Sequence, residues 1–235
     1  MQREEVGLNL LAIIVFIITI LTLLGPVFHI PPTLPAFITF LLLGLVTVDT
    51  LAWKNQGTNL LLNSLAFPQQ KERIIYHEAG HFLTAYLYQI PVSGYTLSPW
   101  EAFKNGQDGA AGVVLDFTPF VDKTKYNLRE LLLQMEKISV VLMAGIAAED
   151  VIYKNILGGE DDRKQMLSIY RDLGLDINQL KLEQRMAVLK AKNLIKENFS
   201  AYLALVEAMK KRLPVAECQE IIRQNLGSKK SESVV

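Results

Sequence analysis

Charged residues are missing from a long N-terminal stretch, and cysteine is nearly missing from the whole chain. No Asp, Glu, Lys or Arg occurs from Val6 to Val48 of the 235 residues, a gap too long for a soluble domain and typical of membrane segments. The single cysteine, Cys218, excludes an internal disulfide and is typical of a small buried apolar residue. Lys and Arg number 24, as do Asp and Glu. With no basic excess, we expect no nucleic-acid partner.

Two apolar runs fill this uncharged stretch. Leu8–Leu24 and Leu34–Trp53 are each long enough to cross about 30 Å of hydrocarbon as a helix. Helix-breaking residues separate them, so we expect a tight transmembrane hairpin. These are Gly25, Pro26, Pro31, Pro32 and Pro35. A cleaved signal peptide is the alternative for the first run, but no small-residue cleavage site follows it.

The basic residues that flank the two runs indicate an orientation. Arg3 precedes the first run, while Lys54, Lys71 and Arg73 follow the second, and the turn has none. Basic residues favour the cytoplasmic side of a membrane. We therefore expect an integral membrane protein with two spans, whose termini and following domain face the cytoplasm or stroma.

The remaining residues predict a mainly α domain with a small β-sheet. Apolar residues recur at helical spacing in several stretches, and two short β-branched or aromatic segments predict strands. Helices are expected at 70–89, at 126–153, from Asp161, at 182–212 as one long or two shorter helices, and at 214–225, with strands at 92–97 and 111–117. The expected organisation is a hairpin with its flanks at 1–56, a linker at 57–64, a mainly helical domain at 65–226 and a disordered tail at 227–235.

Two of the three histidines fall in an H-E-x-x-H pattern on the helix expected at 70–89. Because residues four apart lie on one helix face, His77 and His81 can both reach one zinc ion. Glu78 lies beside them, where a carboxylate can accept a proton from water as a general base. Two structural histidines facing a neighbouring helix are the alternative. The third histidine, His29, lies in the hairpin turn.

A catalytic zinc ion needs a third protein ligand. The residues after His81 lack the downstream histidine of the metzincin pattern, so we expect a carboxylate. The candidates are two acids at the end of the helical stretch 126–153 and three acids after the Gly158-Gly159 turn, namely Glu149, Asp150, Glu160, Asp161 and Asp162. The last three are also typical of a helix N-terminus, where acids cap the backbone.

Four segments resemble matching segments of a known family. They are Glu72–His81, Ala110–Val113, Ala144–Tyr153 and Gly158–Lys164. Over roughly residues 72–224 the chain resembles the protease domain of the FtsH-type ATP-dependent membrane zinc proteases. This resemblance implies Asp162 as the third zinc ligand, since the family's ligand is the acid of a Gly-x-x-Asn-Asp-like segment before a helix. It also implies Glu149 as an outer partner of the metal site.

The chain departs from that family in two respects. No G-x-x-x-x-G-K-[ST] motif occurs in the 235 residues, so the resemblance covers the protease domain and no ATPase module. The family's Asn before the ligand is Asp161 here, which keeps Asp161 as an alternative ligand. The resemblance leaves open with what the chain assembles. The possibilities are a separate ATPase partner, an FtsH-type complex and a homo-oligomer.

These features predict a membrane-anchored zinc metalloendopeptidase that cleaves unfolded or membrane-associated proteins. The expected cofactor is Zn²⁺, and Gly112 to Phe117 is the expected edge for an extended peptide substrate. One alternative is a site-2-type intramembrane protease, but charged residues at 71–73 directly precede the motif. The other is a non-catalytic FtsH-like adaptor or scaffold, which loss of the base or of a ligand would indicate.

Overall fold

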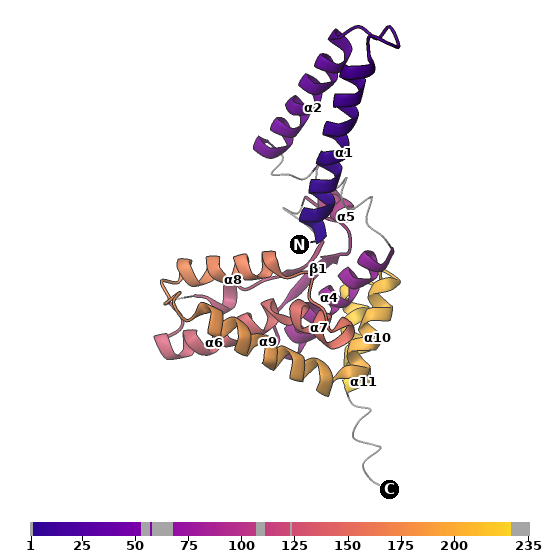
Figure 1. Cartoon of the computed structure of the whole chain (residues 1–235). Coiled ribbons are helices and arrows are strands. Elements are labelled where there is room, and N and C mark those ends of the chain that lie inside the picture. The colour runs from indigo at the N-terminus through magenta and orange to yellow at the C-terminus, as the bar shows by residue number, and fades with distance from the viewer. Residues whose placement is uncertain (1, 53–56, 58–67, 107–110, 123, 227–235) are drawn as a thin grey trace. The chain divides into compact units, whose positions relative to one another are not determined.

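The computed structural model describes residues 2–52, 57, 68–106, 111–122 and 124–226, whose elements are labelled in Figure 1. The structure is mainly helical with a two-stranded sheet, as the sequence predicts. Its residues form two compact units, one of residues 1–67 and 98–110 and the other of residues 68–97 and 111–235. The predicted linker 57–64, apart from Gly57, and the predicted tail 227–235 lie outside the described residues.

A helical hairpin dominates the first unit. Helices α1 (Gln2–Leu24) and α2 (Thr33–Leu51) lie side by side, and most of their described large apolar side chains are exposed. By length and composition, α2 is able to cross a membrane. The stretch Leu128–Tyr153 passes the same test but is mostly buried in the second unit, and the apolar part of α1, Leu11–Leu24, is shorter. The hairpin of two apolar helices agrees with the sequence prediction.

The second unit contains the H-E-x-x-H helix and most of the remaining elements. In chain order these are α4 (Pro68–Leu87), β1 (Val92–Thr96), β2 (Gly112–Leu115), the 3₁₀ helix η1 (Thr118–Phe120), α6 (Leu128–Leu142), α7 (Ala144–Tyr153), α8 (Glu160–Asp172), α9 (Leu180–Glu197), α10 (Phe199–Lys210) and α11 (Val215–Leu226).

Helix α4 lies at the centre of this unit and contacts α6, α7, α9, α10 and both strands. Its second half is buried on several sides, because Ala79, Phe82, Leu83 and Ala85 are all inaccessible to solvent. A helix buried all round belongs to a core rather than to a surface. The H-E-x-x-H motif is thus held on a helix that belongs to the core of the unit.

The helical stretch predicted at 126–153 is divided into two helices. Asn127 caps α6, since its side chain accepts the Glu130 N–H and the Glu130 side chain accepts the Asn127 N–H. Met143, with φ −90° and ψ 1°, departs from α-helical values and separates α6 from α7. Helix α7 therefore starts immediately before Gly145, which packs against His77. Regular apolar spacing does not reveal such a break, because the spacing continues across it.

The two predicted strands pair antiparallel, with Tyr95 opposite Val113 and Thr96 opposite Gly112. Both are shorter than predicted. The polar stretch between them contains a short helix, α5 (Pro99–Lys104), which belongs to the first unit. No helix is predicted in this stretch, because six residues are too few to show helical periodicity.

The C-terminal helices agree with the sequence prediction. The stretch 182–212 forms two helices, α9 and α10, that meet at Asn198. Pro214 was expected as the first residue of the last helix, and its carbonyl accepts the Cys218 N–H one residue before α11 begins. Helix boundaries vary by a residue or two with the criterion used.

Candidate metal centre

The two histidines of the motif project from one face of α4. Their ring centroids lie 4.8 Å apart, as expected for positions four residues apart. Gly80, between them, packs directly on α7, because a Cβ there would lie 2.6 Å from the Ala144 carbonyl oxygen. The small residue lets α4 and α7 approach closely and brings the histidine face against α7 and the segment that follows it.

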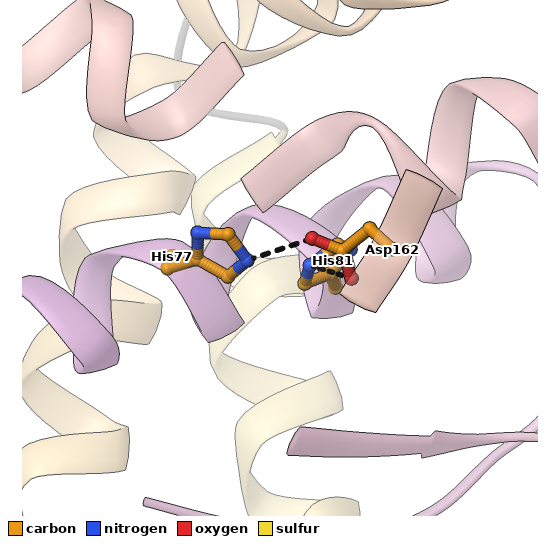
Figure 2. A group of neighbouring side chains, drawn as sticks. All are labelled: His77, His81 and Asp162. Carbon is orange, nitrogen blue, oxygen red and sulfur yellow. Dashed lines mark hydrogen bonds and ion pairs between the residues drawn. The ribbon is translucent and has the colours of Figure 1, made fainter. Parts of the chain in front are cut away.

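Asp162, in the first turn of α8, completes a group of three candidate ligands. Its Oδ2 lies 3.1 Å from His77 Nε2 and its Oδ1 lies 3.4 Å from His81 Nε2, and Figure 2 shows the carboxylate facing both rings. One ligand atom from each residue lies within 4.8 Å of the other two. Two imidazole nitrogens and one carboxylate oxygen are a donor set typical of catalytic zinc.

The remaining ring nitrogens are engaged away from this cluster. His77 Nδ1 lies 2.9 Å from Glu149 Oε1, and His81 Nδ1 lies 2.7 Å from the Val141 carbonyl oxygen. Because a carbonyl oxygen only accepts, His81 Nδ1 carries the hydrogen in that bond. Such contacts fix the ring orientation and direct the Nε2 lone pairs toward a metal ion.

Two glycines make room for this arrangement. A Cβ at Gly145 would lie 2.2 Å from His77 Nε2, and one at Gly158 would lie 2.5 Å from Glu149 Oε1. Any side chain at either position would displace the groups that form the cluster. The donor set, the ring orientation and this close glycine packing together fit a zinc ion.

The structure distinguishes among the five acids that the sequence leaves open as the third ligand. Asp161 is 80% exposed and, like Glu160, pairs with Lys164. Asp150 forms an ion pair with Lys192. Of the five candidates, Asp162 joins the two histidines, and Glu149 contacts His77 from the opposite side. The structure thus brings together the residues predicted as ligands and as outer partner, while their roles stay predictions.

Glu78 is only 6% exposed and lies at the sheet. Its Oε2 accepts the Val113 N–H at 3.0 Å. Burial raises the pKa of the Glu78 carboxyl above its ordinary value, although His77 and His81 oppose the rise. A carboxylate with a raised pKa is a better proton acceptor near neutral pH, as the predicted general base requires.

In the metal-free cluster, the attraction between the histidines and the carboxylates determines the direction of the pKa shifts of His77 and Asp162. Burial would lower the pKa of His77, but hydrogen bonds with Asp162 and Glu149 outweigh it and raise the pKa to about 10. Burial would raise the pKa of Asp162, but the neighbouring His81 and His77 hold it below its ordinary value. A metal ion would take the place of the histidine protons that these carboxylates stabilise.

Several functional contacts were not found by sequence reasoning. The backbone groups of Val113 and Val141 leave no signal in the sequence, because any residue supplies an N–H and a carbonyl. Arg73, which contacts Glu149, lies four residues before His77 and therefore on the same helix face. That spacing is a usable signal for a contact with the metal site, although the sequence patterns alone assign Arg73 no such role.

Comparison with known proteins gives partial similarity to zinc proteases. No family model matches the chain. ATP-dependent zinc metalloprotease FtsH 1 of Rhodopirellula baltica is 35% identical over 105 residues, which cover 43% of this chain and 14% of that protein. ATP-dependent zinc metalloprotease FtsH 2 of Symbiobacterium thermophilum is 28% identical over 169 residues, which cover 67% of this chain and 26% of that protein.

The chain thus spans about a quarter or less of the length of these curated relatives. The identities are low and the coverage is partial. The similarity suggests a relation to zinc metalloproteases of the FtsH type, in agreement with the cluster of His77, His81 and Asp162.

Proposed function

We propose that this chain is a membrane-anchored zinc metalloendopeptidase. One observation carries the proposal: His77, His81 and Asp162 direct ligand atoms to one point, and the carboxylate of Glu78 follows His77 on the same helix. A structural zinc site is closed by four protein ligands, whereas three ligands with an adjacent base are typical of catalytic zinc. The partial similarity to FtsH zinc metalloproteases supports the same conclusion.

Each side chain of the site has its own proposed role in peptide hydrolysis. Bound zinc supplies Lewis-acid chemistry, by which it acidifies water and polarises a substrate carbonyl. Glu78 accepts a proton from water and returns it to the leaving amine nitrogen. The Val113 N–H holds Glu78 Oε2, so we assign the proton transfer to Oε1. His77 and His81 remain neutral ligands, oriented by Glu149 and by the Val141 carbonyl.

Strand β2 is the proposed binding edge for substrate. Its residue Val113 is bonded directly to the catalytic carboxylate, so a peptide laid along β2 would bring its carbonyl groups near Glu78. Main-chain pairing with a strand selects extended segments. We therefore expect unfolded or loosely folded protein segments as substrates.

The hairpin of α1 and α2 is the proposed membrane anchor, with both termini and the peptidase unit on the cytoplasmic or stromal side. The exposed apolar side chains of both helices and the length of α2 support the anchor. The basic residues outside the apolar runs support the orientation. Anchoring raises the local concentration of substrates at the bilayer.

Degradation of an unfolded, casein-like substrate by the reconstituted chain tests the proposed function. Cleavage should stop with a zinc chelator, return with added zinc and proceed equally with and without ATP, because no G-x-x-x-x-G-K-[ST] motif occurs in the 235 residues. A stably folded reporter should stay intact, since exposing its peptide bonds costs several kcal/mol. Absence of cleavage by a zinc-loaded chain would favour the adaptor, and ATP-stimulated cleavage only with an added ATPase would identify a two-subunit machine.

A further inference from the structure

The third candidate ligand lies on α8, which packs against α6 and which a loop joins to α7, the helix packed against the histidine helix α4. Residues 154–159 carry the chain from α7 to α8, and Asp162 lies in the first turn of α8. A shift of this loop by an ångström would move the Asp162 carboxylate away from His77 and His81. The geometry of the proposed zinc site therefore depends on what fixes the loop.

Arg73 is bound to this loop. Its Nη1 donates to the Asn155 carbonyl oxygen at 2.9 Å and to Glu149 Oε2 at 2.8 Å. Its guanidinium also lies over the Tyr153 ring, 4.4 Å from the ring centroid. One side chain of α4 thus contacts the last turn of α7, the loop and the Glu149 carboxylate, with 16% of the side chain exposed.

Glu149 also binds the loop, and it connects the loop to His77. Its Oε2 accepts the Leu157 N–H at 2.8 Å, and its Oε1 accepts the Gly158 N–H at 3.1 Å as well as the contact with His77 Nδ1. The side chain is 2% exposed. A carboxylate buried this far needs several donors and a countercharge, and Arg73 supplies the countercharge and one of the donors.

We propose that Arg73 is a positioning residue that fixes the loop 154–159, and with it Asp162, relative to His77. Arg73 and His77 lie one helical turn apart on α4 and contact the two oxygens of one carboxylate. Arg73 acts through Glu149 and through the Asn155 carbonyl, without touching the metal or the substrate. The inference rests on the proposed zinc site. It identifies Arg73 as the group that holds the third ligand, Asp162, in position.

Zinc affinity of the full-length chain in detergent micelles, measured by competition with a chelator, tests this role. Arg73→Met should bind zinc about 10- to 100-fold more weakly, the loss typical of removing an outer partner of a metal ligand. Arg73→Lys keeps the charge and should recover part of the affinity. Arg73→Gln replaces Arg73→Met as the neutral variant if the latter does not fold.

A matched control separates this role from general stability. Lys192 pairs with Asp150, the neighbour of Glu149 on α7, and is also partly exposed. Lys192→Met removes an ion pair from the same helix, yet it should leave zinc affinity within about threefold of wild type. If both Met variants lower thermal stability alike and only Arg73→Met loses zinc, the effect is specific to the site.

A double substitution tests whether Arg73 acts through Glu149. If it does, Arg73→Met in a Glu149→Gln background should weaken zinc binding far less than it does in wild type, a clear departure from additivity. Wild-type zinc affinity in Arg73→Met or Arg73→Gln, or full additivity with Glu149→Gln, would overturn the inference and leave the zinc site intact. Failure of the wild-type chain to bind zinc would overturn both.

Discussion

Replacing Gly145 by alanine should separate the metal centre from the fold. Gly145 lies in α7, where a Cβ would meet the His77 ring at 2.2 Å from Nε2, 2.4 Å from Cδ2 and 2.5 Å from Cε1. Ordinary contact between such atoms needs about 3.5 Å. The methyl group therefore occupies space that the imidazole needs while Nε2 faces Asp162.

Two opposing effects set the expected magnitude. Alanine inside a helix is favoured over glycine by about 0.8–1.0 kcal/mol, whereas overpacking a core typically costs about 1–3 kcal/mol. The clash falls on a side chain that can rotate, so the net loss of stability should be no more than about 2 kcal/mol. If this rotation displaces the His77 ring atoms by about 1 Å or more, the site loses one of its three ligands. Zinc affinity should then fall at least about 100-fold.

Thermal unfolding and chelator competition measure the two quantities on the same protein. Gly94→Ala is the matched control, because nothing lies within 4 Å of a Cβ at that strand position, and it should retain wild-type zinc affinity. A folded Gly145→Ala protein with wild-type zinc affinity would refute the assignment of His77 Nε2 as a ligand atom. Equal zinc loss in both variants would show that the loss does not come from the clash.

Two further predictions concern the ligands and their protons. Asp162→Asn should weaken zinc binding far more than Asp161→Asn, because the Asp162 carboxylate faces both histidines whereas Asp161 is exposed. Chelator titration of the two variants compares their zinc affinities. The reverse order of affinities would assign the ligand to Asp161. Zinc binding at pH 7 should release at least about one proton per ion, since the pKa of His77, ordinarily 6.5, is raised to about 10 in the metal-free site. The bound proton stabilises the metal-free fold fully below pH 6.5, and this stabilisation is lost as the pH rises through about 10. Calorimetry in buffers of different ionisation enthalpy counts the protons, and binding without proton release would contradict the raised pKa.

The histidine pair was predictable because its signal is local. A spacing of four residues on a helix is sufficient to bring His77 and His81 together, and Glu78 follows directly. The third ligand is not local, since 85 residues separate Asp162 from His77. Helical periodicity left five acids open, and only the family resemblance selected Asp162 and Glu149 among them.

The contacts around the site were harder to predict than the ligands. The close approach of Gly145 to His77 depends on the break at Met143, which the apolar spacing does not reveal. The Val113 N–H and the Val141 carbonyl are backbone groups without a sequence signal. The hairpin, by contrast, followed from composition, because a stretch without charge and with two apolar runs has few other structures.

Substitution of Glu78 tests the central claim most directly. Glu78→Gln keeps the shape of the side chain and an oxygen for the Val113 N–H, but it removes the carboxylate that accepts a proton from water. This variant should bind one zinc ion per chain with wild-type affinity and cleave an unfolded peptide at least about 100-fold more slowly. Cleavage at the wild-type rate by zinc-loaded Glu78→Gln would contradict the account.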